Sequence, residues 1–511
     1  MNIRTAALGV ALLVLLFGWA GVQLVGYSTI LKFGLSAYPP TLDPHISGGT
    51  AARTVKTTVY EGLMTYTPEG DIAPQVAESV EVLDPITYIF HLRKGVVFHS
   101  GKELTAADVV YSFQRILDPS TGAVLREILS MVLEDVVAEN DYTILIKLRI
   151  PFAPFLEVLA TPEASIVSAE WMAQKPDLKT TMNGTGPFKL KSLTVGVEIF
   201  LVKNERYYIP RLPKVEGISF QVFSDPDARL NALLTGAVDI IEYVEWRQIP
   251  ILNNTPGFVV DLKPAFFQIL SVNCSAGPLA DPRVRRAISY AINREEIVAA
   301  CFEGYAEPLY GALIPKGHWA YNEDLASFFE YNPARAKELL AEAGYPQGFT
   351  VKLLATSAYS THWCPAEVIQ AQLAEVGIKV ELELVDWPTR VQRRSDWNYE
   401  LASDGLSGYY NDPDFYYAYF HGAGPRYCHP PYFDDPVVND LLEKGRATLD
   451  RDVRKQIYHD LEARLLELSP WIFLCYRLQP YAYAAKVRGF VQLLGFLSPY
   501  SGVTLKYASV D

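Results

Sequence analysis

Cysteine is scarce in this chain of 511 residues. There are only five, and the first 273 residues contain none. The five are Cys274, Cys301, Cys364, Cys428 and Cys475. This wide spacing and odd number exclude a dense disulfide framework, and at most two bridges could form with one thiol left over. Buried free thiols are the favoured interpretation. The lack of an early cysteine also excludes lipid attachment at an N-terminal cysteine.

The chain has fewer basic than acidic residues. Lys and Arg number 45 against 58 Asp and Glu, which gives a formal net charge of −13. Such a chain repels phosphate backbones, so we expect no nucleic-acid partner. Half of the residues are hydrophobic and 20% are charged, which excludes wholesale disorder. At ~150 residues per domain the length indicates roughly three structural units.

Long apolar runs are missing everywhere except at the start. Arg4 is followed by an uncharged stretch from Thr5 to Leu31. A basic start before an apolar run is typical of an export signal, and the run also exceeds the ~20 residues needed to span a bilayer. We expect residues 1–31 to be a signal peptide or an N-terminal membrane anchor, with cleavage favoured. Without a second such run, a multi-span channel is excluded.

Catalytic and metal-binding signatures are also missing. Gly405-Leu406-Ser407-Gly408 has the wrong spacing for a nucleophile elbow, and Gly101-Lys102 lacks the flanking residues of a phosphate-binding loop. Paired carboxylates would leave no such signature, but we do not expect an enzyme. His421, Cys428 and His429 lack the tight spacing of a dependable metal site, so we expect loop histidines and no metal or cofactor.

What the chain does contain is a pattern of alternating strands and helices. Residues 351–355 and 379–385 are predicted strands, and 365–376 is a predicted helix between them. Such a βαβ unit makes the two strands parallel with a right-handed connection. N-cap residues predict helices elsewhere, and breaks containing proline near 187, 264 and 480 are candidate crossings between lobes. The predicted N-caps are Thr105, Asp281, Asn293 and Asn332.

An ordered set of motifs extends from about Lys32 to near the C-terminus. The motifs are Leu42-Asp43-Pro44, Tyr60-Glu61-Gly62-Leu63, 70–79, 90–101, 104–112, Gly184-Thr185-Gly186-Pro187-Phe188, 281–294, 332–345 and Asn411-Asp412-Pro413. In this order they resemble the family 5 (oligopeptide- and dipeptide-type) extracellular solute-binding proteins of ABC transporters. Each motif alone is a modest signal, whereas the whole series is a strong one.

The resemblance implies an α/β fold of the two-lobed periplasmic-binding-protein type (type II, family 5 or cluster C). An extra domain is inserted in the first lobe of such proteins. By analogy, lobe I would comprise three segments, the extra domain one, and lobe II one. The expected boundaries are 32–63, 187–262 and 480–511 for lobe I, 64–186 for the extra domain and 263–479 for lobe II.

The resemblance also implies a function. Such a protein captures an oligopeptide, dipeptide or related small solute in an interlobe cleft and delivers it to ABC permease subunits in the membrane, while a separate cytoplasmic ATPase hydrolyses ATP. It works in the periplasm or elsewhere outside the cytoplasm, free or tethered by an uncleaved N-terminal segment. Two alternatives stay open: a binder of a non-peptide solute (opine, sugar or metal chelate), and a sensory protein that presents its ligand to a receptor.

One position departs from the peptide-binding pattern. Aligned on Asn411-Asp412-Pro413, Tyr409 stands where peptide binders place an aspartate that pairs with the α-ammonium of the peptide, and Leu406 replaces the usual aromatic residue. A neutral phenol cannot supply the charge-assisted hydrogen bond of a carboxylate. The amine anchor is therefore absent unless Asp404 or Asp412 replaces it, and peptide and non-peptide solutes stay equally open.

Candidate ligand contacts follow from the same resemblance. The small residues after the Asp-Pro turn face the cleft in relatives and would let the backbone approach a ligand, although a plain turn is an equal alternative. Trp387 stands at a pocket-aromatic position, where a core role is nearly as plausible. The candidates are Ser47, Gly48, Gly49, Thr50, Phe267, Asn273, Trp387, Asp404, Tyr409 and Tyr410.

Overall fold

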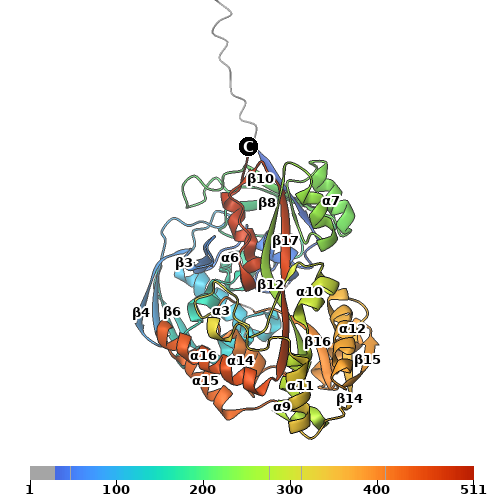
Figure 1. The fold of residues 1–511 in the computed structure, drawn as a ribbon. Coiled ribbons are helices and arrows are strands. Elements are labelled where there is room, and N and C mark those ends of the chain that lie inside the picture. Colours follow the sequence, from blue (N-terminus) through green and yellow to red (C-terminus); the bar gives the residue numbers. More distant parts are fainter. Residues whose placement is uncertain (1–28, 47, 276, 312, 409) are drawn as a thin grey trace, which may run out of the picture.

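Two long antiparallel strands run through both halves of the molecule in the computed structural model, which describes residues 29–46, 48–275, 277–311, 313–408 and 410–511 (Figure 1). They are β12 (Phe258–Val272) and β17 (Trp471–Ala484). They lie in the middle of an 11-stranded sheet of order β15-β14-β16-β12-β17-β11-β1-β10-β9-β8, with β13 (Ala306–Pro308) paired to β17. One sheet therefore serves both lobes.

Lobe I holds one half of this sheet. β1 pairs in parallel with β10 and β11, and β9 and β8 extend the edge as antiparallel strands. The end of the chain returns to this lobe and adds a short sheet of β18 and β19. The elements are β1 (Ile30–Leu35), α2 (Gly49–Lys56), β8 (Phe188–Thr194), β9 (Glu198–Lys203), β10 (Gly217–Val222), α7 (Pro226–Leu234), β11 (Ile240–Glu242), α8 (Ile249–Asn253), β18 (Val487–Arg488), the 3-10 helix η6 (Gly495–Tyr507) and β19 (Ser509–Val510).

Lobe II holds the other half, and the predicted βαβ unit is confirmed there. β14 (Thr350–Thr356) and β15 (Lys379–Val385) pair in parallel, joined by α12 (Ser360–Glu375). The predicted caps are also confirmed, because the side chains of Asp281, Asn293 and Asn332 accept backbone N–H groups at their helix starts. The remaining elements are α9 (Pro282–Ala291), α10 (Arg294–Phe302), α11 (Pro333–Glu342), α13 (Trp387–Ser395), β16 (Leu401–Leu406), α14 (Phe415–Phe420), α15 (Pro436–Ala447) and α16 (Arg451–Leu468).

Residues 64–186, the predicted extra domain, contain a separate sheet of order β4-β5-β7-β6 and a β2–β3 hairpin. Its apolar side chains form a core around Phe90, Val109 and Ile144, and a few residues from outside the segment, such as Tyr410 and Leu497, join it. Thr105 caps the helix α3 (Ala106–Leu117) as predicted. The backbone N–H of Thr105 donates to the side chain of Asp108 at 3.1 Å. The elements are β2 (Met64–Tyr66), β3 (Ile72–Pro74), β4 (Ala77–Asp84), β5 (Thr87–Leu92), α3 (Ala106–Leu117), α4 (Arg126–Val132), β6 (Leu133–Asn140), β7 (Thr143–Leu148), α5 (Phe155–Leu159) and α6 (Ala169–Ala173). The exact unit boundaries stay a prediction.

The predicted signal or anchor, residues 1–31, falls mostly outside the described residues. β1 begins at Ile30, so the last two residues of that predicted segment belong to the sheet. Among the described residues, no helix has both the length and the apolar character that crossing a membrane requires.

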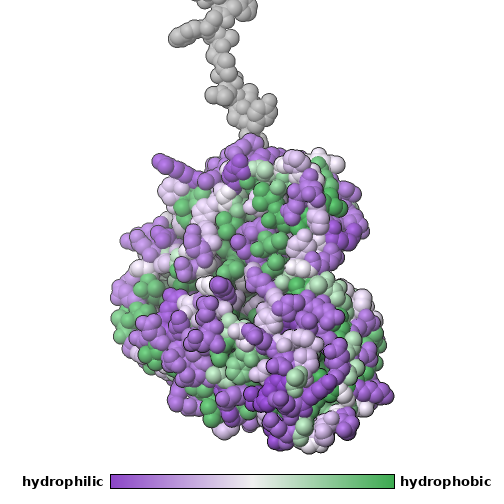
Figure 2. All heavy atoms as spheres, in the orientation of Figure 1, coloured by the Kyte–Doolittle hydropathy of each residue, from purple (hydrophilic) through white to green (hydrophobic). Residues whose placement is uncertain are grey.

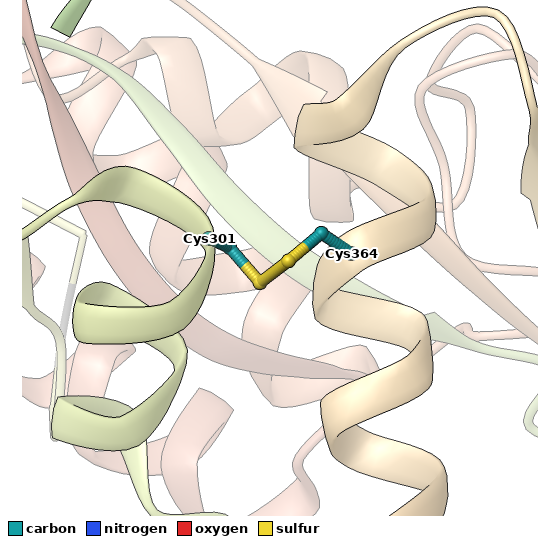
Figure 3. The surroundings of a disulfide bond; sticks show 2 residues. All are labelled: Cys301 and Cys364. Atoms are coloured by element: carbon teal, nitrogen blue, oxygen red, sulfur yellow. A yellow bond between two sulfur atoms is a disulfide. The ribbon is translucent and has the colours of Figure 1, made fainter. Parts of the chain in front are cut away.

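The interpretation of all five cysteines as free thiols is wrong for two of them. Cys301 on α10 and Cys364 on α12 form a disulfide with their Cα atoms 5.6 Å apart (Figure 3). The two lie 63 residues apart in sequence, and they meet because α10 and α12 pack side by side in lobe II. Cys274, Cys428 and Cys475 are free.

We expect this disulfide to stabilise lobe II. Closing a loop of this length restricts the unfolded chain, an effect worth roughly 2–5 kcal/mol. The urea midpoint of the wild type should therefore fall when dithiothreitol is added. The Cys301→Ser/Cys364→Ser variant should have the lower midpoint without reductant, and dithiothreitol should not change it. Cys428→Ser, which removes a free thiol, should respond to reductant as the wild type does. A wild-type midpoint that does not move in reductant would contradict this role.

Candidate functional site

A cavity of about 360 Å³, here called the cleft cavity, opens between the two lobes. Lobe I contributes the start of α2 and Tyr243, and lobe II contributes the end of β16 and a loop after α14. Figure 2 shows the surface indented on one side between the part that carries α7 and the part that carries α12. The lining residues are Gly49, Thr50, Arg53, Tyr243, Phe266, Leu406, Ser407, Gly408, Tyr419, Tyr427, Cys428, Phe496, Pro499 and Tyr500.

A second cavity of about 350 Å³, here called the hinge cavity, shares Tyr243 with the cleft cavity. Its walls are the segment 243–246 of lobe I, the start of α12 at 359–361, and residues 477–480 of β17. Both volumes lie within the range of ~300–1,000 Å³ that holds small ligands. Together the two cavities follow the line along which the lobes face one another.

Tyr243 organises the lobe I wall. It has a φ of +50°, a left-handed conformation that is uncommon outside glycine. Its hydroxyl lies 3.0 Å from Oγ1 of Thr50 on α2. Gly49, with a φ of +76°, begins that helix at the cavity edge. The strained tyrosine is thus tied to the helix start that lines the cleft.

Arg53 and Arg477 are the two cations of the cavity walls, and they differ in their partners. Nε of Arg53 donates to Glu163 at 2.7 Å, so this charge is balanced. Within the described ranges, the side chain of Arg477 makes no hydrogen bond or ion pair, and its Nε is buried without a partner. Its guanidinium lies 4.5 Å from the ring centre of Phe266, and burial lowers its pKa. Arg477 is an unbalanced cation at the cleft.

A buried cluster of two arginines and one carboxylate lies behind the lobe II wall. Asp404 is 1% exposed and contacts both Arg390 and Arg394, with Nε of Arg394 at 2.5 Å. Nη1 of Arg390 donates to the hydroxyl of Tyr427, which lines the cleft cavity. Burial and then the charge of Arg390 lower the pKa of His362 to about 4, so this histidine is neutral near pH 7. The cluster carries one excess positive charge.

The other carboxylates of this segment are paired as well. Arg454 binds Asp412 through two hydrogen bonds of 2.8 and 2.6 Å, and Arg446 binds Asp414 through two of 2.9 and 2.8 Å. All of these groups are buried. An ammonium group in the cleft would therefore find the carboxylates of the segment 404–414 already balanced by arginine.

Comparison with known protein families identifies the family of this chain. The model of "Bacterial extracellular solute-binding proteins, family 5 Middle" matches residues 71–427. The chain belongs to this family. The family 5 fold predicted from the sequence is thereby confirmed, and solved structures of family 5 binding proteins superpose on nearly the whole chain.

Individual relatives of this family 5 chain bind different solutes. The binding protein AgaA from A. tumefaciens R10, solved in complex with agropinic acid, is 38% identical in sequence to this chain. Its structure superposes with a TM-score of 0.80 over 94% of this chain and 99% of AgaA. The periplasmic binding protein DppA from Helicobacter pylori, in complex with the peptide STSA, is 26% identical, with a TM-score of 0.77 over 94% and 98%. The glutathione-binding protein GsiB of Pectobacterium atrosepticum is 28% identical over 461 residues, 88% of this chain and 89% of that protein.

The function that follows from family 5 membership is solute binding for ABC import. Members are binding proteins of transporters and not enzymes, and their ligands include peptides and opines. The capture of a small solute, predicted from the sequence, is confirmed at this level.

The structure brings only some of the predicted contact residues to the cavities. Gly49 and Thr50 line the cleft cavity, and Gly48 is the N-cap of α2 next to them. Trp387, half-buried, meets Tyr359 of the hinge-cavity wall edge to face, with ring centres 5.0 Å apart. Ser47 and Tyr409 lie outside the described residues. Ligand contact stays a prediction for all of these.

The other predicted contacts lie behind the walls. Phe267 is fully buried in the core of lobe II, and Tyr410 donates to Asp414 at 2.6 Å. Asn273 donates to the backbone carbonyl of Tyr399 at 2.9 Å. Asp404 belongs to the buried arginine cluster. Their roles as ligand contacts also stay predictions, and in this structure each already has neighbours that account for its position.

Sequence reasoning missed Arg477, Tyr243 and Tyr427. Arg477 did carry a signal, because it is the one charged residue of the strand Trp471–Ala484. A lone arginine inside a buried strand is costly unless something balances its charge. Tyr243 and Tyr427 lie in irregular segments with no comparable pattern, so only the fold places them at the cleft.

The arginine cluster predicts a stability effect that a ligand anchor would not have. Asp404→Asn leaves Arg390 and Arg394 buried without a counter-charge, so we expect a loss of about 3–5 kcal/mol in the free energy of unfolding. Urea unfolding would measure it. Asp396→Asn, an exposed change on the same side of lobe II, should stay within about 0.5 kcal/mol of the wild type. Unchanged stability of Asp404→Asn would refute a structural role for the cluster.

Proposed function

We propose that this protein is the exported binding subunit of an ABC importer and captures a small acidic solute, of the opine type, in its interlobe cleft. It acts outside the cytoplasm and delivers the solute to permease subunits that are driven by a separate cytoplasmic ATPase. The protein itself performs no catalysis. Closure of the lobes around the solute would be stabilised only by contacts that are better in the closed state.

The observation that carries this proposal is the unbalanced charge of Arg477. Arg477 is half-buried, and its Nε is fully buried without a partner, which is costly; a ligand carboxylate would remove that cost by forming charge-assisted hydrogen bonds. Such bonds contribute about 1.5–3 kcal/mol each. Because Arg477 lies on β17, where the chain passes between the lobes, a carboxylate bound there lies at the innermost part of the cleft.

The charge of the lobe II wall supports the same class of solute. The cluster of Asp404, Arg390 and Arg394 has one excess positive charge, and Tyr427 connects it to the cleft cavity. Arg454 and Arg446 balance Asp412 and Asp414. These pairs leave no free carboxylate for the α-ammonium of an ordinary peptide among the described residues of 404–414, so an acidic group is the better-matched ligand end.

Two relatives are named with acidic ligands, which supports an acidic solute for this chain. AgaA, at 38% identity, is named with agropinic acid, and GsiB, at 28% identity, with glutathione. Glutathione has free carboxylates. DppA, at 26% identity, is named with an unmodified peptide, STSA. An opine is therefore the first class to test, and a short peptide the second.

Replacement of Arg477 tests the proposal. Thermal unfolding and calorimetry would be run with agropinic acid, glutathione and the peptide STSA. The wild type should bind at least one of the two acids, which raises its melting temperature by mass action. Arg477→Met should bind that acid about 10- to 100-fold more weakly, the loss of roughly one charge-assisted bond, and Arg477→Lys should recover part of the affinity.

The matched control is Arg206→Met, because Arg206 is an exposed arginine of lobe I away from the cleft. It should bind as the wild type does. Equal affinity of the wild type and Arg477→Met for the acid would overturn the role of Arg477. Preferential binding of STSA, lost on acetylation of its α-amine, would overturn the acidic-solute proposal as a whole.

A further inference from the structure

A third cavity, here called the outer cavity, lies on the other side of the Tyr66 and Tyr500 rings from the cleft cavity. It encloses about 310 Å³ and shares no lining residue with the cleft or hinge cavities. Four segments far apart in sequence form its walls: the β2–β3 hairpin, Arg93 after β5, the loop 208–210 of lobe I, and the end of η6 at Lys506 and Tyr507. None of the motifs or comparisons above assigns it a ligand.

Lys506 is the most unusual group of this wall. Its side chain lines the cavity although the residue is only 7% exposed. Across the described part of the chain it makes no hydrogen bond or ion pair through its ammonium group, which lies 5.4 Å from the ring centre of Tyr507. Burial lowers the pKa of Lys506, and the nearby charge of Glu61 opposes that shift. The ammonium is thus desolvated without a direct partner.

Glu61 is the carboxylate whose charge acts on Lys506, but three neutral donors hold it and it forms no direct ion pair with the ammonium. Gln75 donates to Oε1 at 3.0 Å and Tyr207 donates to the same oxygen at 2.7 Å, while Thr185 donates to Oε2 at 3.0 Å. Glu61 is 1% exposed and forms no ion pair with Lys506. The charge of Glu61 therefore acts on the ammonium without a direct contact.

A second cation faces the same cavity. Nε of Arg93 donates to the backbone carbonyl of Gln75 at 2.9 Å, and no carboxylate of the described residues pairs with this guanidinium. Between the two cations the walls are flat and largely apolar. They are formed by Tyr66, Pro74, Tyr208, Pro210 and Tyr507. Two cations and flat rings are complementary to an anion on a flat apolar body.

We propose that the outer cavity is a second ligand site, which binds a small carboxylate with a flat apolar body through Lys506 and Arg93. A carboxylate there supplies the partner that the Lys506 ammonium lacks, and the rings of Tyr208 and Tyr507 cover the body of the ligand. The site is separated from the cleft by the stacked rings of Tyr66 and Tyr500, whose centres are 6.3 Å apart. It acts independently of Arg477.

The probe is 4-fluorobenzoate, titrated into the full chain and followed by the line width of its fluorine NMR signal. The wild type should bind it, and Lys506→Met should bind at least about tenfold more weakly because the charge-assisted contact is lost. Lys191→Met, which removes an exposed lysine of β8, should bind as the wild type does. Arg477→Met should also be unchanged, which separates this site from the cleft.

Other ligands and a second variant decide the remaining outcomes. The neutral 4-fluorobenzamide should not bind, and inorganic phosphate should compete poorly because its tetrahedral shape leaves the flat walls uncovered. If Lys506→Met proves unstable in thermal unfolding, Arg93→Met provides the same comparison. The proposal is overturned if 4-fluorobenzoate does not bind, if the benzamide binds equally, if phosphate displaces the benzoate at equal concentration, or if folded variants at both cationic positions bind as the wild type does.

Discussion

The pairing of β12 with β17 is the constraint on which the two-lobed structure depends. These strands run antiparallel from Phe258 opposite Ala484 to Ser271 opposite Trp471, and they are the link that makes one sheet of the two half-sheets. Proline interrupts the ladder on both strands, with Pro264 opposite Leu478 and Pro480 opposite Leu262. Because proline has no N–H, each removes a possible ladder hydrogen bond, and the register shifts just after Pro264. The weakest part of the pairing thus coincides with the passage between the lobes.

The distribution of charge around the cleft follows from this arrangement. Arg477 occupies the same part of β17 as Pro480, so the cation is carried by the connecting strand and belongs to neither lobe alone. The carboxylates of the segment 404–414 lie in lobe II and are balanced by arginines of α13, α15 and α16. The protein has an overall charge of −13, yet Arg477 at the hinge cavity and the cluster of Asp404, Arg390 and Arg394 behind the cleft wall are locally cationic. Net composition therefore says little about what a buried site attracts.

Local features of the fold could be predicted from the sequence, and features that join distant segments could not. The helix starts at Thr105, Asp281, Asn293 and Asn332 depend on side chains two or three residues from the groups they cap, and the βαβ unit depends on periodicity within about 35 residues. The disulfide depends on the packing of α10 against α12, and no spacing rule encodes that contact. The proline positions near 264 and 480 fall within the two strands that join the half-sheets, but the single sheet that runs through them was not foreseen.

The candidate site divides in the same way. Gly49 and Thr50 were predicted because a motif precedes them in sequence, whereas Arg477, Tyr243 and Tyr427 come together only through the fold. The bridge between Cys301 and Cys364 adds a consequence for how the protein matures. Because α12 starts at the wall of the hinge cavity, this bridge fastens one side of the binding region to the body of lobe II. Thiols stay reduced in the cytosol and oxidise outside it. If the chain is exported as proposed, this part of lobe II would gain its covalent fastening only after leaving the cytosol.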